Sequence, residues 1–517
     1  MKKILAIVLC ACMICALLAG CGSSGSPAAA VEGDVLKIGI FEPATGENGA
    51  GGMQEVLGAR YANKVVPSVT VNGKEYKIEL VEVDNQSDKT AAVTAAQNLV
   101  SSGVIAVIGS YGSGVSIAAG STFEQAKIPA VGGSCTNPQV TLGNDYYFRV
   151  CFLDPFQGTV MASYANNEGC KKAAVIMQNG DDYSTGLANY FADAFAKMDG
   201  CEVVYTGTYN TNETDFNAIL TAAKAADPDV LFIPSSITTA GIIIKQARDM
   251  GITARIMAGD TWENATIMEN AGVENCEGVA LSTFFDENDA DASEFVQGFK
   301  AYLNGDAEAL KLNGNNDTVA AVSALGYDAY MAIIEALKNV SGDITGEAVR
   351  DALASVSFDG VTGSISFDEN GDAIESPNVF LVCGSPGSGK TTYVLRNKLP
   401  HDLVIDLDYI CAALMGESGG VRLDFRAVLP TALEVRKLLY QCIQQRRGKW
   451  ERAFVVTATA DALEMRRLAQ ELNAELVLMD TTLKECLERI RNDPQRNRSR
   501  RKFERLAIEW HEKYSKS

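Results

Sequence analysis

A phosphate-binding loop is predicted at residues 384–391, which match the pattern G-x-x-x-x-G-K-[ST]. The loop directly follows an apolar segment, Val379–Val382, that favours a strand, and a helix is expected to begin at Lys390. Glycines let backbone N–H groups curl around a β-phosphate, a lysine reaches the β- and γ-phosphates, and a hydroxyl ligates Mg²⁺. The nucleotide-binding residues expected from this pattern are Gly384, Gly387, Ser388, Gly389, Lys390, Thr391 and Thr392, with Thr391 as the magnesium ligand.

Two other loops carry hydroxyl groups near predicted helix starts. Gly109–Gly114 follows a strand that ends at Ile108 and opens a helix, so its free N–H groups and the Ser113 hydroxyl suit a carboxylate. Residues 133–138 follow the next strand and offer further hydroxyls and turned backbone. Ligands of open parallel sheets bind at this edge, beside the carboxyl ends of the strands. Ser113 and Thr136 can also serve only as helix caps, which is a common role of such residues.

Short apolar strands alternate with amphipathic helices from residue 35 onward, which predicts parallel sheets covered by helices on both faces. The first run has expected strands at Leu36–Phe41, Ile78–Val83, Val104–Gly109, Ala130–Gly132 and Tyr147–Val150, helices at Thr90–Val100 and Ser116–Gln125, and a hairpin turn at Asn72-Gly73. The second run has strands at 172–177, 202–207, 229–233 and 254–258 and helices at about 184–198, 213–226 and 239–250. Two lobes are therefore expected, at about 35–150 and 151–275. A helical stretch, Asn316–Val340, and a strand, Gly363–Asp368, are expected to cross back and complete them.

The first 21 residues have the features of an export signal with a lipid-anchoring cysteine. Met1-Lys2-Lys3 precede an apolar stretch, Ile4–Leu18, that is too short for a comfortable membrane span. Leu18-Ala19-Gly20-Cys21 resembles the lipobox of bacterial lipoproteins, in which the cysteine is acylated, and residues 22–34 supply a small, flexible tether. An ordinary signal peptide or a short anchor helix is the alternative.

The charge of the chain changes sharply near residue 376. Residues 376–517 hold 24 Lys+Arg and 18 Asp+Glu, a net +6, whereas the first 375 hold 21 and 47, a net −26. Such a shift marks a boundary between modules, here 35–375 and 376–517. Both histidines, His401 and His511, lie in the basic module. This excludes histidine-based metal sites and Ser-His or Cys-His catalysis from the acidic module.

From about residue 34 to 374 the chain resembles the leucine/isoleucine/valine-binding family, the type I solute-binding proteins of ABC importers. The motifs that together carry the resemblance are Gly39 to Gly46, Gly109 to Ala118, Ser134-Cys135-Thr136-Asn137-Pro138, Tyr183-Ser184-Thr185-Gly186, Gly259-Asp260-Thr261-Trp262 and Ser366-Phe367-Asp368-Glu369-Asn370-Gly371. The resemblance implies a non-enzymatic domain without a cofactor. Such a domain binds a small amino acid between two lobes and has the permease subunits of an importer as partners.

Carried over by position, the resemblance implies five ligand-binding residues: Ser113, Ser134, Thr136, Tyr183 and Asp260. Ser113 and Thr136 would hold the α-carboxylate, whereas the Ser134 carbonyl, Thr136 and Asp260 would hold the α-ammonium. Tyr183 would cover the ligand from the second lobe. Asp260 is shorter than the glutamate often found at its position, and Gly51 stands where an aromatic residue often packs. Both differences leave the identity of the amino acid open.

Residues 378–517 resemble small P-loop kinases and ATPases, similar to polynucleotide kinases and zeta-toxin-like phosphotransferases. The strands expected after the loop are Leu403–Leu407, Ala453–Val456 and Glu475–Met479. The resemblance implies ATP and Mg as cofactors if the domain is active, with Asp408 activating an acceptor hydroxyl and Arg491 and Arg496 forming a lid over the phosphates. The strand Ala453–Val456 leads into Thr457 rather than the acid usually found on the metal-binding strand. The arginines also fit a solvated basic helix or a nucleic-acid-binding surface, so nucleic acid is a possible partner of this domain alone.

The expected architecture is α/β: two doubly wound parallel-sheet lobes of the type I periplasmic binding fold, followed by a third α/β P-loop NTPase domain. The favoured function is an extracytoplasmic binding lipoprotein, lipid-anchored to the membrane through Cys21, for a branched-chain or related amino acid. An ATP-dependent phosphotransferase or ATPase is the alternative, as is a chimeric reading frame in which only the binding domain functions. The junction at 373–378 favours a fusion as the origin, because the family normally continues there into a final strand. An exported domain meets almost no ATP, so the kinase-like module would be latent.

Overall fold

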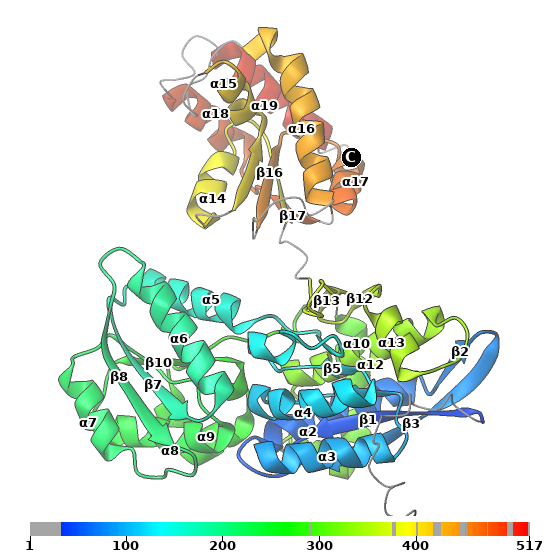
Figure 1. Ribbon diagram of the computed structural model, residues 1–517. Helices are drawn as coiled ribbons and strands as arrows, with labels where there is room; N and C mark the ends of the chain where they lie inside the picture. The colour runs from blue at the N-terminus through cyan, green and yellow to red at the C-terminus, as the bar shows by residue number, and fades with distance from the viewer. Residues whose placement is uncertain are drawn as a thin grey trace, which may run out of the picture. The chain divides into compact units, whose positions relative to one another are not determined.

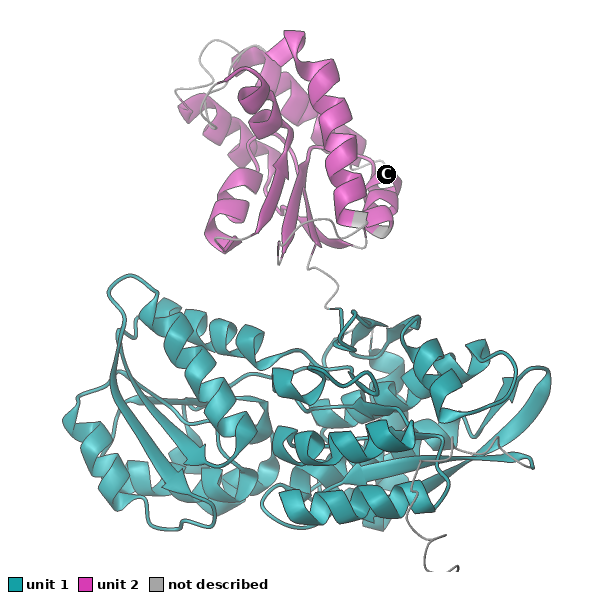
Figure 2. Ribbon diagram, in the orientation of Figure 1, with its two compact units in different colours: residues 1–374 teal, residues 375–517 magenta. Residues whose placement is uncertain are grey.

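The structure, a computed structural model, divides the chain into two compact units: unit 1, residues 1–374, and unit 2, residues 375–517 (Figure 2). It describes residues 33–289, 292–374, 379–399, 402–416, 425–444, 450, 452–472, 474–493 and 500–514. The predicted signal with Cys21, residues 22–32 of the predicted tether, Arg496 and residues 375–378 of the predicted junction lie outside the described residues.

The first lobe of unit 1 is built on a six-stranded sheet in the order β2-β3-β1-β4-β5-β6. Its strands are β1 (Val35–Glu42), β2 (Ser68–Val71), β3 (Lys74–Asp84), β4 (Ala106–Ile108), β5 (Ala130–Gly132) and β6 (Tyr147–Arg149). Neighbouring strands are parallel except β2 and β3, which form the hairpin predicted at Asn72-Gly73. Both turn residues have positive φ angles, 50° and 79°, which asparagine and glycine adopt most readily.

Helices cover both faces of this sheet (Figure 1). They are α2 (Gly49–Val65), α3 (Lys89–Ser101), α4 (Ser113–Ala126), α10 (Ser293–Gly305), α11 (Ala307–Leu312), α12 (Ala321–Asn339) and α13 (Gly346–Leu353). One hydrophobic core contains α2, α12 and α13, whereas α3 and α4 contribute to another. At Gly58 the helices α2 and α12 approach so closely that a Cβ atom would lie 1.9 Å from the Ser323 carbonyl oxygen. The sheet is therefore buried on both faces, as its apolar strands predict.

The second lobe contains a five-stranded parallel sheet in the order β11-β10-β9-β7-β8. Its strands are β7 (Lys172–Asn179), β8 (Glu202–Asn210), β9 (Val230–Phe232), β10 (Arg255–Ala258) and β11 (Ala280–Leu281). Its helices are α5 (Asp154–Asn167), α6 (Asp182–Ala196), α7 (Asn217–Ala225), α8 (Ile237–Asp249) and α9 (Ala265–Ala271). The helices α5 and α6 share one core with the sheet, and α7, α8 and α9 share the other. The predicted doubly wound α/β class is confirmed for unit 1.

One predicted strand, Gly363–Asp368, does not complete either lobe. Its residues form β13 (Gly363–Ser366), which pairs with β12 (Ser357–Gly360) in a separate antiparallel hairpin. The Asp328 carboxylate of α12 accepts hydrogen bonds from the N–H groups of Val361 and Thr362 at 2.9 and 2.8 Å, which holds the turn of this hairpin on the helix. The predicted helix Asn316–Val340 likewise begins only at Ala321.

Unit 2 contains a four-stranded parallel sheet in the order β15-β16-β14-β17. Its strands are β14 (Val379–Cys383), β15 (Leu403–Asp406), β16 (Ala453–Thr457) and β17 (Ala474–Leu478). Its helices are α14 (Lys390–Asn397), α15 (Leu407–Leu414), α16 (Leu429–Gln444), α17 (Ala462–Leu472), α18 (Leu483–Asn492) and α19 (Arg500–Tyr514). The strand, loop and helix predicted around Lys390 are thus confirmed. Across the ranges that the structure describes, none of the helices has the length and apolar composition that a membrane crossing requires.

Candidate functional site

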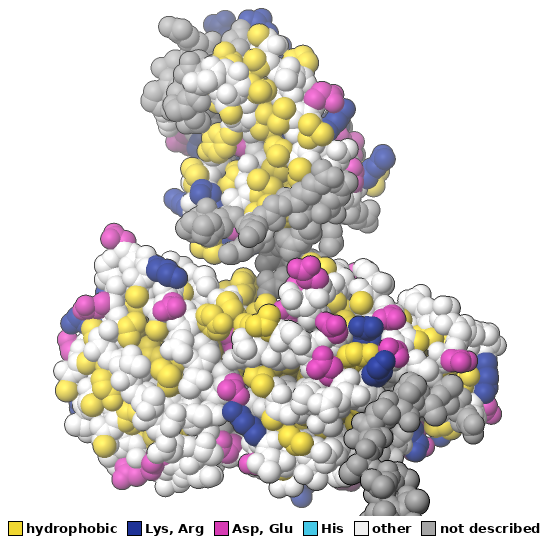
Figure 3. Space-filling model, viewed as in Figure 1, with side chains coloured by type: hydrophobic (Ala, Val, Ile, Leu, Met, Phe, Trp, Pro, Cys, Tyr) yellow, Lys and Arg dark blue, Asp and Glu magenta, His cyan; other side chains and the backbone are white. Residues whose placement is uncertain are grey.

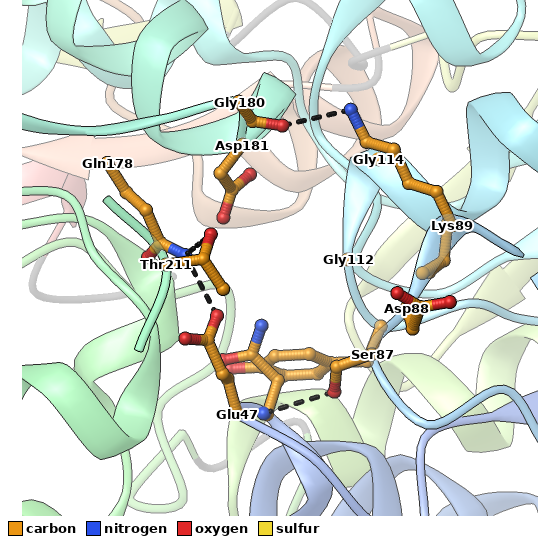
Figure 4. Close-up of a pocket in the computed structure, with 13 residues that line it drawn as sticks. Glu47, Ser87, Asp88, Lys89, Gly112, Gly114, Gln178, Gly180, Asp181 and Thr211 are labelled. Atoms are coloured by element: carbon orange, nitrogen blue, oxygen red, sulfur yellow. Dashed lines mark hydrogen bonds between the residues drawn. The ribbon is translucent and has the colours of Figure 1, made fainter. Parts of the chain in front are cut away.

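The two lobes of unit 1 meet along a closed cleft that polar contacts bridge. Lys89 Nζ, on the first lobe, lies 2.7 Å from Asp182 Oδ2 on the second. Gln178 Nε2 donates a hydrogen bond across the same boundary to Glu47 Oε2 at 2.8 Å (Figure 4). Gln178 lies at the end of β7 and Asp182 follows that strand, so the carboxyl edge of this sheet faces the first lobe. This is the edge at which ligands of parallel sheets bind.

Ser113 lies at the first position of α4, on the first-lobe side of the cleft, and its side chain is fully buried. Its Oγ atom accepts a hydrogen bond from the backbone N–H of Asn137 at 3.1 Å. Because the oxygen acts there as acceptor, the hydroxyl proton can still be donated to a ligand. The Asn137 side chain in turn donates to the Asp182 carbonyl at 2.7 Å, which ties this loop to the second lobe.

Ser134 and Thr136, which follow β5, lie beside two carboxyl groups. Ser134 Oγ donates a hydrogen bond to Glu55 Oε2 at 2.5 Å. The Thr136 carbonyl accepts the backbone N–H of Asp154 at 3.0 Å. The Thr136 hydroxyl is buried and has no hydrogen-bond partner within the described ranges. An unpaired hydroxyl of this kind can serve a ligand.

The second lobe contributes Tyr183, near the start of α6, and Asp260, which opens the short turn η2 (Asp260–Trp262). The Tyr183 hydroxyl donates to Asp260 Oδ1 at 2.9 Å, and Gln157 Oε1 accepts the Asp260 N–H at 3.0 Å. Burial raises the pKa of Asp260 to about 6, although hydrogen bonds with Gln157 and Tyr183 oppose this effect. Tyr183 therefore positions the Asp260 carboxyl group, a contact that the sequence did not suggest.

The space left by Gly51 is filled by Tyr111. A Cβ atom at Gly51 would lie 2.5 Å from Tyr111 Cζ and 2.9 Å from Ile237 Cδ1, so no larger residue fits there without rearrangement. The Tyr111 ring is buried, and its hydroxyl donates to the Thr261 carbonyl of the second lobe at 3.4 Å. Tyr111 thus supplies the aromatic surface that was expected to be missing at position 51.

A cavity of about 220 Å³ lies between the lobes, next to the loop that holds Ser113. Gly112 and Gly114, on either side of Ser113, both line it. Figure 4 shows Glu47, Asp88 and Asp181 around this cavity, with the Lys89 ammonium turned toward the Gly180 carbonyl. The cavity joins both lobes and has several carboxylates in its wall.

None of the five predicted ligand-binding residues is among those that line this cavity. They are buried beside it, and buried carboxyl groups link them. The charge of Asp260 adds to burial in raising the pKa of both Glu55 and Asp154, which contact Ser134 and Thr136 respectively. The sequence analysis missed the carboxyl groups of Glu42, Glu55 and Asp154. Glu42 is the last residue of β1, so the rule that located Ser113 at a strand end could have found it.

Acidic solution is expected to stabilise unit 1. In the folded unit, burial raises the pKa of Glu55 and Glu263 to about 7 and that of Asp260 to about 6. A carboxyl group whose folded pKa is raised contributes stability that is complete below its unfolded pKa and is lost as pH rises through the folded pKa, by up to about 3 kcal/mol for one group. Calorimetry of the ligand-free full chain should therefore give a higher Tm for unit 1 at pH 5 than at pH 8. Glu55→Gln should reduce the difference, and equal Tm values at both pH values would contradict the prediction.

In unit 2 the loop between β14 and α14 has the shape that a phosphate group requires. Gly387 and Gly389 have φ angles of 86° and 98°, which side-chain-bearing residues rarely adopt. Lys390 Nζ donates to the carbonyl oxygens of Gly384 and Ser385 at 2.7 and 3.0 Å. The Ser388 hydroxyl is buried without a hydrogen-bond partner in the described part of unit 2. These residues fit the predicted phosphate-binding role, with Thr391 and Thr392 at the start of α14 beside them.

The predicted catalytic residues of unit 2 are not all at this loop. Asp408 lies on α15, where its N–H donates to Asp406 Oδ1 at 2.9 Å and its side chain is exposed. Arg491 pairs with Glu504 of α19 at 2.9 Å instead of contacting the loop. The loop contact is made by Arg489, whose Nη1 donates to the Ser388 carbonyl at 3.0 Å. Arg489 is therefore a better lid candidate than Arg491.

Both units match known proteins. Residues 35–383 match the family model described as periplasmic binding protein, and residues 379–514 match the model described as AAA domain. An amino acid binding protein from Pseudomonas aeruginosa is 34% identical over 226 residues, which are 43% of this chain and 60% of that protein. The chain thus spans less than two thirds of that relative.

Two solved structures are similar to unit 1 over nearly their whole length. The leucine binding protein LivK from Thermotoga maritima has a TM-score of 0.59 and 34% identity, over 66% of this chain and 93% of that one. The branched-chain amino acid transporter substrate binding protein LivJ from Streptococcus pneumoniae, solved with isoleucine, has a TM-score of 0.58 and 30% identity over the same shares. These matches confirm the predicted fold of unit 1.

Proposed function

Since the chain belongs to the periplasmic binding protein family, we propose that unit 1 captures a free amino acid, branched-chain or related, for an ABC importer. The observation that carries the proposal is the meeting of two kinds of group inside one closed cleft. Donors lie on the first lobe, at Ser113 and Thr136, and the Asp260 carboxyl lies on the second. A zwitterion needs such an arrangement, because its carboxylate requires donors and its ammonium requires acceptors.

In the proposed complex each pole of the amino acid has its own partners. The Ser113 hydroxyl and the N–H groups at the start of α4 donate to the α-carboxylate, where the helix dipole also favours negative charge. The Ser134 carbonyl and the Asp260 carboxylate accept from the α-ammonium. Tyr183 holds Asp260 in place. Closure of the lobes excludes water, which strengthens these charge-assisted hydrogen bonds.

The proposed setting is the outer face of the cell membrane. The basic start, the apolar stretch and Cys21 support export and acylation, and the permease subunits of an importer are the proposed partners. Isoleucine in the S. pneumoniae relative supports an amino acid as cargo.

Titration calorimetry of the full chain with the twenty free amino acids tests the proposed function. We expect saturable one-to-one binding of at least one of them. Blocking its amino group by acetylation, or its carboxyl group as an amide, should weaken binding at least about tenfold, because each change removes a charge-assisted contact. If none of the twenty amino acids binds, or if the blocked forms bind as tightly as the free amino acid, the proposal is contradicted.

For unit 2 the candidate function is ATP-dependent phosphotransfer or ATP hydrolysis. The loop geometry at Gly387 and Gly389, with Lys390 and Arg489 beside it, favours this candidate. ATP would supply the phosphoryl group, and Mg²⁺, ligated by the Thr391 hydroxyl, would offset its charge. If unit 2 binds no nucleotide, the alternative explanation holds: the reading frame is a chimera in which only unit 1 functions.

Replacing Lys390 by Ala is expected to weaken ATP binding by the full chain at least about tenfold, because the ammonium no longer contacts the phosphates. Fluorescence titration with a labelled ATP analogue and Mg²⁺ measures the change. Arg396→Ala, on the exposed side of the same helix, is the matched control and should bind as the parent does. Equal affinities of the parent and Lys390→Ala would rule out the nucleotide role of this loop.

A further inference from the structure

Four carboxyl groups, here called the cleft carboxyls, gather inside the closed cleft of unit 1: Glu42, Glu55, Asp154 and Asp260. Each is at most 3% exposed. On the face of unit 1 seen in Figure 3, by contrast, acidic and basic side chains are scattered among uncharged ones. Negative charge is therefore concentrated where water is excluded, which is costly unless a cation or a proton compensates it.

The cations that border the cleft have other partners. Arg149 is fully buried, but its Nε lies 2.6 Å from Asp372 Oδ1 and its Nη1 donates to the Cys135 carbonyl at 2.7 Å. Lys89, at the rim, is paired with Asp182. Neither side chain is hydrogen-bonded to a cleft carboxyl within the described residues. Burial raises the pKa of Asp154 although the charge of Arg149 opposes this effect, so the four groups still call for another source of compensation.

The unpaired hydrogen-bonding atoms around the cleft also indicate a ligand rich in donors. Apart from the contact between the Glu42 and Glu55 carboxyl groups, the buried oxygen atoms without a hydrogen-bond partner among the described residues around the cleft are Glu42 Oε1, Glu55 Oε1, both Asp154 carboxyl oxygens and Thr136 Oγ1. In the same part of the structure Gln157 Nε2 is a buried donor without a partner. The Thr136 hydroxyl and Gln157 Nε2 can donate, but the four carboxyl oxygens accept. Acceptor atoms therefore still outnumber donor groups, and a ligand that fits must donate more hydrogen bonds than it accepts.

Glu42 and Glu55 also interact with each other. The charge of Glu55 and a hydrogen bond between the two carboxyl groups add to burial in raising the pKa of Glu42, and burial raises the pKa of Glu55 to about 7. Their other oxygens are already used, since Glu42 Oε2 accepts the Tyr111 N–H at 2.6 Å and Glu55 Oε2 accepts the Ser134 hydroxyl. Two neighbouring carboxyl groups need either a shared proton or a cationic donor between them.

Resting on the proposed function, we propose that the amino acid bound in this cleft carries a net positive charge, as lysine and arginine do. Its additional ammonium or guanidinium group donates to Glu42 and Glu55 in place of a shared proton. Asp260 keeps the role described above. Such a ligand neutralises the cleft carboxyls and donates hydrogen bonds to their unpaired oxygens. An aliphatic amino acid has only its α-ammonium for both purposes.

Matched ligand pairs test this assignment by titration calorimetry on the full chain. Lysine is compared with norleucine, arginine with citrulline, and agmatine represents a cation without a carboxylate. We expect lysine or arginine to bind at least about tenfold more tightly than its neutral partner. Neutral partners that bind as tightly or more tightly overturn the inference and leave the proposed function standing. Binding of agmatine but of neither basic amino acid overturns the inference and the amino acid as cargo. Absence of binding for all five compounds overturns the inference, and the titration with the twenty amino acids then decides the proposed function.

Carboxyl variants then locate the selectivity. In Glu42→Gln and Glu55→Gln, we expect the lysine-to-norleucine affinity ratio to fall at least about fivefold, because the partner of the second cation has lost its charge. Glu79→Gln, on the exposed part of β3, is the control and should keep the parent ratio. Thermal unfolding verifies that each variant is folded. An unchanged ratio in either folded carboxyl variant overturns the inference.

Discussion

Replacing Asp260 by Asn is expected to weaken amino acid binding by unit 1 at least about 100-fold, since the ammonium loses a buried, charge-assisted partner. The side chain is 3% exposed and receives the Tyr183 hydroxyl at 2.9 Å, so water cannot replace the lost charge. Because burial raises the pKa of the Asp260 carboxyl to about 6, the neutral variant should fold at least as well as the parent at pH 8. Calorimetric titration and the Tm of the ligand-free chain measure the two effects separately.

The same carboxyl group predicts a pH dependence of binding. Below about pH 6 Asp260 takes up a proton, and a neutral acid holds an ammonium less tightly, so the affinity of the parent should fall as pH decreases. The exposed Asp199→Asn variant is the control and should follow the parent. Wild-type affinity in a folded Asp260→Asn variant would remove Asp260 from the site.

Replacing Arg149 by Met should lower the free energy of unfolding of unit 1 by about 3–5 kcal/mol, because it leaves a buried network without its central donor. The guanidinium contacts Asp372 Oδ1 at 2.6 Å, the carbonyls of Cys135 and Asn137 at 2.7 Å, and Thr141 Oγ1 at 2.7 Å. These contacts fix the loop that carries Ser134 and Thr136, so ligand binding should weaken together with stability. Urea unfolding of the full chain, followed on the transition of unit 1, gives the change.

A matched variant shows whether the loss of stability comes from this network or from removing any guanidinium group. Arg350 is partly exposed, and its guanidinium lies over the Tyr146 ring at 4.9 Å. Arg350→Met should cost no more than about 1 kcal/mol, as is usual for an exposed cation–π contact. Equal losses in the two variants would mean that the Arg149 network has no special role.

The sequence predicted the strands well because both faces of each sheet are covered. The apolar run Leu36–Phe41 became β1, Val35–Glu42, since every residue of a doubly buried strand must be compatible with a core. The strand at Gly363–Asp368 was placed wrongly, because periodicity shows that a segment is extended but not which segment it pairs with. Its pairing depends on the bonds from Asp328, on a distant helix, to the hairpin turn.

The site was predictable only where it follows strand ends. Ser113 and Thr136 lie within five residues of the ends of parallel strands, so topology alone places them near the binding edge. Glu55 lies inside α2, and only packing of that helix against the loop of Ser134 brings its carboxyl group to the cleft. Similarly, the choice between Arg489 and Arg491 depends on the rotation of α18 about its axis, which residue spacing does not fix.

The strand β14 also dictates where this polypeptide can be divided. The two family matches overlap at residues 379–383, which are this strand, and its backbone is hydrogen-bonded on one side to β16 and on the other to β17. A strand saturated along both edges has no N–H or C=O groups left for a second sheet. Severing the chain before Val379 therefore leaves both ladders of β14 intact in unit 2. A cut after Cys383 would strip unit 2 of its central strand and append an unpaired apolar tail to unit 1, a combination prone to aggregate.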